Sequence, residues 1–237
     1  MAGEYFRWKY RDVKPEEKRE LTRAEKRKNW WDYHKGYVAA GIIAVFLLGY
    51  MVWSILGIGR VRPDYQIAYV GAAALPDDTA AALETALSEL GEDLNGDGKV
   101  VVTLHQYVAY VDSPQQAQAA MISLAADVES RESFFFLLDD PEGFQLNYAV
   151  LSYPDGALPE KDDLSAGGTY LSWAECPVLS GLDLGGYSQD YLGVEITGDN
   201  QELLSRLYIA RRGFWDDEGC DYLEGCEALW AKLRAGT

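Results

Sequence analysis

The chain has 237 residues and a formal net charge of −17 at pH 7, with 48% hydrophobic and 25% charged residues. This composition is typical of a foldable chain and excludes a largely disordered protein. Residues 1–35 hold 11 Lys or Arg against 7 Asp or Glu, residues 36–59 hold neither, and residues 60–237 hold 10 against 31. Because nucleic-acid binding needs a basic surface, we expect no nucleic-acid partner.

Residues 1–35 form a short basic segment that is too small for a core of its own. Thr22 is followed three residues later by Glu25, which predicts a capping box and a helix that continues toward residue 36. The basic side chains predict a topology signal. The alternative is that these side chains contact anionic lipid or another membrane protein. An accessory subunit of a membrane complex would make the second kind of contact.

Residues 36–59 read GYVAAGIIAVFLLGYMVWSILGIG and carry no charged side chain. A helix of this length would span about 36 Å, against about 30 Å for the hydrocarbon core of a bilayer. Trp30, Trp31, Tyr50 and Trp53 lie toward the two ends, where aromatic rings meet the headgroups. The segment is therefore predicted to cross the lipid bilayer once.

Basic residues before the span outnumber those that closely follow it, which predicts a cytoplasmic N-terminus and an extracytoplasmic domain over residues 60–237. A signal peptide cleaved near Gly57 and Gly59 is the alternative. The apolar run exceeds the 7–15 residues of a usual signal peptide, which favours an uncleaved anchor in the cell membrane.

The acidic domain begins with alternating strand and helix patterns. Strands are predicted at 65–71, 100–107 and 134–138. Helices are predicted from Asp77 or Asp78, as a cap, through Leu90, and from Ser113 and Pro114 through Val128. This order predicts an α/β fold with βαβαβ units and a mainly parallel sheet.

The second half of the domain is less regular. A loop is predicted at 153–168, and short strands at 169–173 and 191–197. A helix is expected after a cap at Asp199 or Asn200, and the pattern of Leu and Trp predicts a last helix at 222–233.

The run Asp93-Leu94-Asn95-Gly96-Asp97-Gly98-Lys99 matches the first half of a calcium-loop signature. Side-chain oxygens of Asp93, Asn95 and Asp97 and the carbonyl of Lys99 would point to one centre, where Ca²⁺ takes oxygen ligands. The twelfth position is Leu104, so the usual bidentate glutamate is absent. A polar turn between a helix and a strand is the alternative explanation.

This helix, loop and strand pattern resembles the calcium loop of the bacterial galactose-binding protein, a sugar-binding family in which a carboxylate elsewhere in the chain completes the site. The whole chain also resembles a group of single-pass bacterial membrane proteins with an external α/β domain of solute-binding type. Three segments carry that second resemblance: NWWDYHKGY at 29–37, DLNGDGKVVV at 93–102 and FFFLLDDPEGF at 134–144. The resemblance implies an α/β fold and a location outside the cell membrane, and it implies no activity.

Two acidic clusters could form a site. Asp139 and Asp140 follow a predicted buried strand, and the carboxyl ends of parallel strands are where ligands bind. They are therefore our candidate ligand-binding residues, and either could supply the missing calcium carboxylate. A second cluster lies at residues 216–218, and together the two could serve a surface hydrolase with paired carboxylates.

The three cysteines, Cys176, Cys220 and Cys226, fall in the external domain, where disulfides persist. At most one intramolecular pair can form, and three buried free thiols are the alternative. Cys220 and Cys226 could pair only if the chain bends between them, because six residues along a straight helix put their Cα atoms roughly 9 Å apart.

These observations predict a membrane-anchored extracytoplasmic domain that binds a small-molecule ligand or a partner, that is stabilised by calcium and that performs no catalysis. An accessory subunit of a membrane complex and a surface hydrolase are the alternatives.

Overall fold

The protein is described from a computed structural model, which defines residues 20–55, 62–109, 113–161, 163–165, 167–191, 193–215 and 219–237. The chain divides into two compact units, Met1–Arg60 and Val61–Thr237. Each unit is described by itself below.

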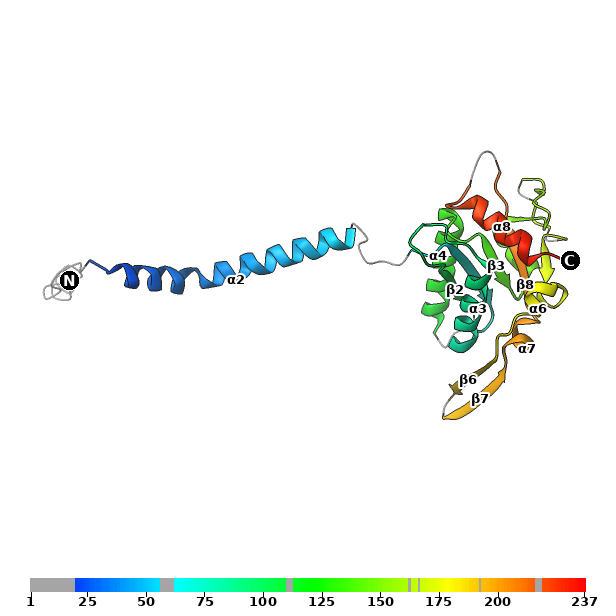
Figure 1. The fold of residues 1–237 in the computed structure, drawn as a ribbon, viewed down its shortest axis with the longest axis horizontal. Coiled ribbons are helices and arrows are strands. Elements are labelled where there is room, and N and C mark those ends of the chain that lie inside the picture. Colours follow the sequence, from blue (N-terminus) through cyan, green and yellow to red (C-terminus); the bar gives the residue numbers. More distant parts are fainter. Residues whose placement is uncertain are drawn as a thin grey trace, which may run out of the picture. The chain divides into compact units, whose positions relative to one another are not determined.

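The described part of the first unit is dominated by one helix, α2 (Arg23–Ile55) (Figure 1). Its start has the expected capping box, because the Glu25 carboxylate accepts from the Thr22 backbone N–H at 2.8 Å and from its hydroxyl at 2.9 Å. The helix is long and apolar enough to cross a membrane. Residues 56–59 of the predicted span lie outside the described residues.

The second unit is an α/β structure, as its sequence predicts (Figure 1). Its helices are α3 (Asp77–Leu90), α4 (Pro114–Ser130), α5 (Pro141–Tyr148), the short turn η1 (Trp173–Glu175), α6 (Pro177–Ser180), α7 (Asn200–Leu204) and α8 (Leu223–Leu233). Its strands are β1 (Tyr65–Gly71), β2 (Val102–Val108), β3 (Phe135–Leu138), β4 (Leu151–Ser152), β5 (Tyr170–Ser172), β6 (Gly186–Tyr191), β7 (Val194–Asp199) and β8 (Tyr208–Arg212).

The main sheet has the strand order β2-β1-β3-β8-β4, and β5 also pairs with β8. β1 pairs in parallel with β2 and β3, whereas β8 is antiparallel to β3, β4 and β5. The sheet is therefore mixed, with a parallel half. The strand at β8 was not predicted, because two of its five residues, Arg211 and Arg212, are charged.

The core lies on both faces of this sheet. Phe135 and Leu137 of β3 belong to one apolar cluster with Leu83 and Leu87 of α3, and with residues of α8. Phe136 and Leu138 belong to a second cluster with Leu124 of α4 and Phe144 of α5. A strand buried on both faces explains the continuous apolar run at 134–138.

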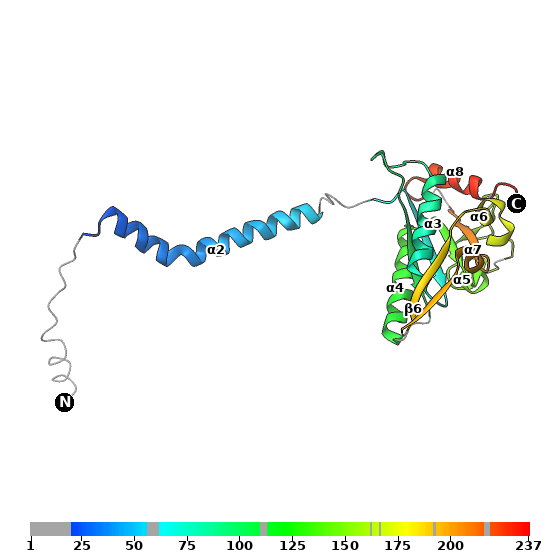
Figure 2. The ribbon, with the colours of Figure 1, turned by 60° about the horizontal axis from the view of Figure 1, so that its bottom comes forward.

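Two local predictions are corrected. The residue before α3 is Pro76, without a side-chain cap, and Asp77 and Asp78 instead occupy the first turn. The strand predicted at 191–197 is part of a two-stranded hairpin, β6 and β7, which is separate from the main sheet (Figure 1). In the view of Figure 2 the hairpin overlaps the helices, and the Ser188 N–H of β6 donates to Asp78 of α3 at 3.1 Å. Asp199 does cap α7, accepting from the Glu202 N–H at 2.9 Å.

Candidate functional site

The carboxyl ends of β1 and β3 lie side by side, because the two strands pair in parallel. β2 pairs with the other side of β1. The edge formed by these carboxyl ends is the position where open α/β sheets commonly bind ligands. Here its polar groups hold the loop after β1: Asp139 accepts from the Ala72 N–H at 2.5 Å, and the Tyr69 hydroxyl donates to the Ala73 carbonyl at 2.7 Å. Burial, together with the nearby Asp139 charge, raises the pKa of Tyr69 to about 12.

Asp140 caps α5 by accepting from the Gly143 N–H at 2.9 Å. It also borders an open hollow of about 630 Å³, together with Glu142, Leu146 and Leu164 among others. Asp139 does not line this hollow. The two predicted ligand-binding carboxylates therefore have separate structural tasks, and only Asp140 lines a described hollow.

The predicted calcium loop folds around its own polar side chains. Asp93 accepts from the N–H groups of Gly96 and Gly98 at 2.7 and 2.8 Å, and Asn95 accepts from the Asp97 N–H at 2.9 Å. Asp97 accepts from the Lys99 N–H at 2.9 Å. Gly96 and Gly98 have φ of 75° and 85°, a left-handed region that glycine adopts at little cost.

The carboxylate that lies against this loop is Asp64, just before β1, and neither Asp139 nor Asp140 forms a described bond there. Asp64 is buried, and it accepts from the N–H groups of Leu94, Asn95 and Val101 at 2.8 to 3.0 Å. Its oxygens are thus already used. Within the described ranges, no group of three or more His, Cys, Asp or Glu residues converges as a metal site would require. The side chains of Asp93, Asn95 and Asp97 already accept backbone N–H groups of the loop, which is also the pattern of a polar turn.

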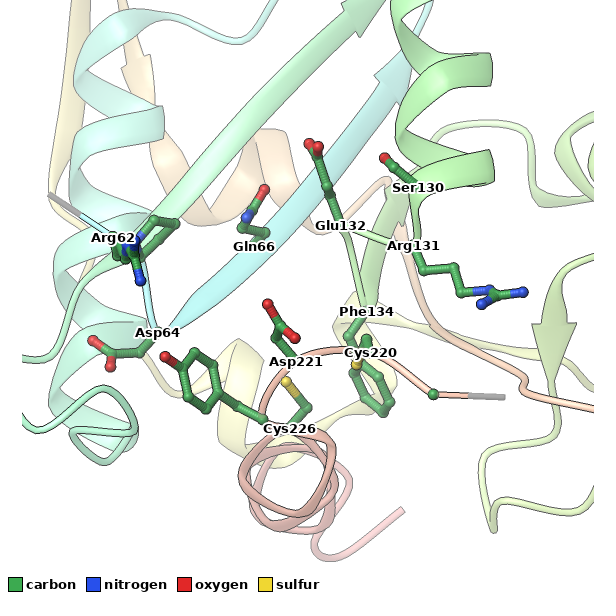
Figure 3. Close-up of a pocket in the computed structure, with 13 residues that line it drawn as sticks. Arg62, Asp64, Gln66, Ser130, Arg131, Glu132, Phe134, Cys220, Asp221 and Cys226 are labelled. Atoms are coloured by element: carbon green, nitrogen blue, oxygen red, sulfur yellow. The ribbon is translucent and has the colours of Figure 1, made fainter. Parts of the chain in front are cut away.

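A larger cavity, of about 690 Å³, lies at the opposite edge of the sheet (Figure 3). We call it the amino-end cavity, because it lies at the starts of β1 and β3. Three separate segments line it: the entry to β1, the turn from α4 into β3, and the approach to α8. The lining residues are Arg62, Pro63, Asp64, Gln66, Ser130, Arg131, Glu132, Phe134, Gly219, Cys220, Asp221, Tyr222 and Cys226.

Three polar side chains line one part of this cavity. Figure 3 shows the side chains of Gln66, Glu132 and Asp221 around the same space, while Asp64 and Arg131 point to either side. Glu132 and Asp221 are exposed to solvent. In the part of the chain that the structure describes, neither carboxylate has a side-chain hydrogen bond or salt bridge, so both are available to a ligand.

The backbone of the cavity wall is unusual at two positions. Arg131 and Tyr222 have left-handed φ values of 60° and 58°. Arg131 ends α4, where this conformation is common, whereas Tyr222 precedes α8 and turns the chain sharply. Below the α4 end, buried Asp127 accepts from the Tyr107 hydroxyl and from both the N–H and the hydroxyl of Ser133.

The left-handed residue Tyr222 stands between two of the cysteines, so they do not lie on one straight helix. Cys220 lies before the bend and Cys226 lies within α8, and both line the cavity as free thiols. Cys176 is fully buried in the core. The acidic cluster predicted at residues 216–218 lies outside the described residues.

Sequence reasoning missed the amino-end cavity because its walls come from distant segments. Gln66, Glu132 and Asp221 share no motif and no spacing. A usable signal was the Cys220 to Cys226 spacing, which brings two thiols together if the chain bends. Comparison with known protein families, curated proteins and solved structures finds no match to this chain, so the geometry carries the functional argument.

Proposed function

We propose that this protein is a membrane-anchored, extracytoplasmic domain that binds a cationic ligand, or a basic segment of a partner, in the amino-end cavity. Helix α2 supports the anchor, because it is long and apolar enough to cross a bilayer. The excess of basic residues before it supports a cytoplasmic N-terminus.

The observation that carries the binding proposal is a pair of carboxylates, Glu132 and Asp221, which have no side-chain partner among the described residues and line one cavity with the Gln66 amide. Charges that already have internal partners give little to a ligand, whereas these two can form new charge-assisted hydrogen bonds. Residues 60–237 also carry 31 acidic against 10 basic side chains, so the surrounding field attracts cations.

We also propose that the loop at 93–99 holds a weakly bound structural calcium ion. Asp93, Asn95 and Asp97 supply side-chain oxygens, and Lys99 supplies its carbonyl. The ion would bring positive charge among carboxylates that otherwise repel one another. Its role is stabilisation of the loop that leads into β2.

Calorimetric titration of the full chain in non-ionic detergent with tri-lysine tests the binding proposal. We expect the parent to bind tri-lysine and to bind tri-glutamate not at all. The double variant Glu132→Gln/Asp221→Asn should weaken tri-lysine binding roughly tenfold, because two partly exposed charge pairs contribute about 0.5–1 kcal/mol each. Binding should also weaken as salt is added.

The matched control is Glu142→Gln/Glu160→Gln, which removes the same charge from exposed positions that do not line the amino-end cavity. It should bind tri-lysine as the parent does. An equal loss in the control would show that only net charge matters, and an unchanged affinity in the cavity variant would exclude the cavity as the site.

A further inference from the structure

The two thiols in the amino-end cavity differ in exposure. Cys220 is partly exposed, whereas Cys226 is 4% exposed and packs in the core beneath it. The left-handed Tyr222 directs the chain from Cys220 into α8, and the Cys226 N–H donates to the Tyr222 carbonyl at 3.0 Å. Both thiols line the cavity, and Cys220 is the more exposed of the two (Figure 3).

The surroundings of the pair shift the pKa values of the two thiols in opposite directions. A hydrogen bond from the Cys226 thiol, and the nearby Arg212 charge, lower the pKa of Cys220. The same hydrogen bond, together with burial, raises the pKa of Cys226 far above its usual value. A partly exposed thiol with a lowered pKa, beside a second thiol, is an arrangement that favours reaction of the first.

Cys176 provides the internal contrast. It is 0% exposed and lies in the core cluster with Trp173 and Leu179. Burial raises its pKa to about 11. A thiol that is protonated and inaccessible does not attack a disulfide at neutral pH.

We propose that Cys220 and Cys226 form a thiol–disulfide exchange site that opens onto the amino-end cavity and accepts a small-molecule disulfide as its oxidant. The Cys220 thiolate attacks one sulfur of the disulfide, forms a mixed disulfide and releases one thiolate. The Cys226 thiol then loses its proton and attacks the Cys220 sulfur, which forms the Cys220–Cys226 disulfide and releases a second thiolate. The protein loses two electrons and two protons, and the small molecule is reduced to two thiols.

This activity is independent of the cationic ligand proposed above, and it is tested without it. The full chain in detergent is equilibrated with glutathione disulfide, its free thiols are alkylated, and its peptides are weighed. Trypsin leaves both cysteines in the peptide 213–232, and cleavage before Asp221 separates them. We expect this peptide to lose two alkylation sites and to stay linked after cleavage at Asp221, whereas Cys176 remains alkylated.

Four variants resolve the steps. Cys226→Ser should accumulate one glutathione on Cys220, and Cys226→Ala repeats the test with a smaller side chain. Cys220→Ser should accumulate none. Cys176→Ser should oxidise at the rate of the parent. In the parent, Cys220 should react roughly tenfold or more faster than Cys176.

The parent chain alone can overturn the proposal, whatever the variants do. Full alkylation of both Cys220 and Cys226 after glutathione disulfide treatment would exclude the exchange site. So would equal reaction rates at Cys220 and Cys176, since these would indicate unfolding rather than a built site.

Discussion

The two edges of the main sheet use their polar residues in opposite ways. At the carboxyl ends of β1 and β3, Asp139 and Tyr69 are bonded to the backbone of the neighbouring loop. At the amino ends, Glu132 and Asp221 line a cavity and have no side-chain partner among the described residues. The polar groups of the first edge stabilise the fold, and the second edge is where we propose that a ligand binds.

The antiparallel strand β8 explains this difference. Because β8 runs opposite to β3, its carboxyl end lies at the amino ends of β1 and β3, and the chain continues from there to Cys220 and α8. Ligands commonly bind at the carboxyl ends of strands. In this sheet each edge has such ends, those of β1 and β3 at one edge and that of β8 at the other. The edge that collects loops from three distant segments is the one that forms the cavity.

The largest expected effect concerns the support of the cavity wall. Asp127→Ala removes the acceptor of three hydrogen bonds, from the Tyr107 hydroxyl and from two groups of Ser133, in a buried place. We expect a loss of about 3 kcal/mol in the free energy of unfolding. Chemical denaturation of the full chain in detergent measures it, with Glu129→Ala on the exposed side of α4 as the control. A loss no larger than that of the control would contradict the role of Asp127.

The next effect concerns the loop at 93–99. Millimolar calcium should raise the melting temperature of the parent, and stabilisation should reach about 1 kcal/mol when free calcium is several times Kd. Asp93→Ala should abolish this shift and also lower stability without calcium, because Gly96 and Gly98 lose their acceptor. Magnesium serves as the control ion, since it demands stricter geometry. A parent that melts at the same temperature with and without calcium would show that the loop is a polar turn.

A smaller effect is expected at the carboxyl-end edge. Asp139→Asn keeps the shape of the side chain but weakens the bond from the Ala72 N–H, and should cost about 1 kcal/mol. Tri-lysine affinity should not change, because Asp139 does not line the amino-end cavity. A tenfold loss of affinity in this variant would move the binding site to the opposite edge.

The smallest effect is a pH dependence at Tyr69. Its pKa rises from 10 to about 12 in the folded protein, because the hydroxyl is buried. The protonated Tyr69 hydroxyl therefore contributes fully to the free energy of unfolding below pH 10, and this contribution is lost as the pH rises through 12. Tyr69→Phe should be about 1 kcal/mol less stable than the parent at pH 8, and this deficit should shrink above pH 10. A deficit that stays constant up to pH 12 would contradict the assignment.

Sequence patterns predicted the elements whose formation depends on neighbouring residues. The run YQIAYVG gave the bounds of β1, and Thr22 with Glu25 gave the start of α2. Strand β8 escaped prediction because its two arginines are buried only through tertiary partners: Arg211 with Glu227, and Arg212 with the Val128 carbonyl. The same reason applies to Asp64, whose three bonds reach 30 residues or more along the chain.

The candidate site was harder to predict than the fold. Asp139 and Asp140 follow a buried strand as expected. The sequence does not show that Asp139 accepts a hydrogen bond from a loop N–H, or that Asp140 caps a helix. Glu132 and Asp221 lie 89 positions apart by number, and only the pairing of β8 with β3 brings their segments to one edge.

Hydrogen–deuterium exchange of the full chain with and without tri-lysine tests most directly that the amino-end cavity is the binding site. We predict slower exchange in peptides that cover residues 130–134 and 219–226, and unchanged exchange at 71–75 and 139–143. Protection at 71–75 and 139–143 instead, with none at the amino-end cavity, would contradict it.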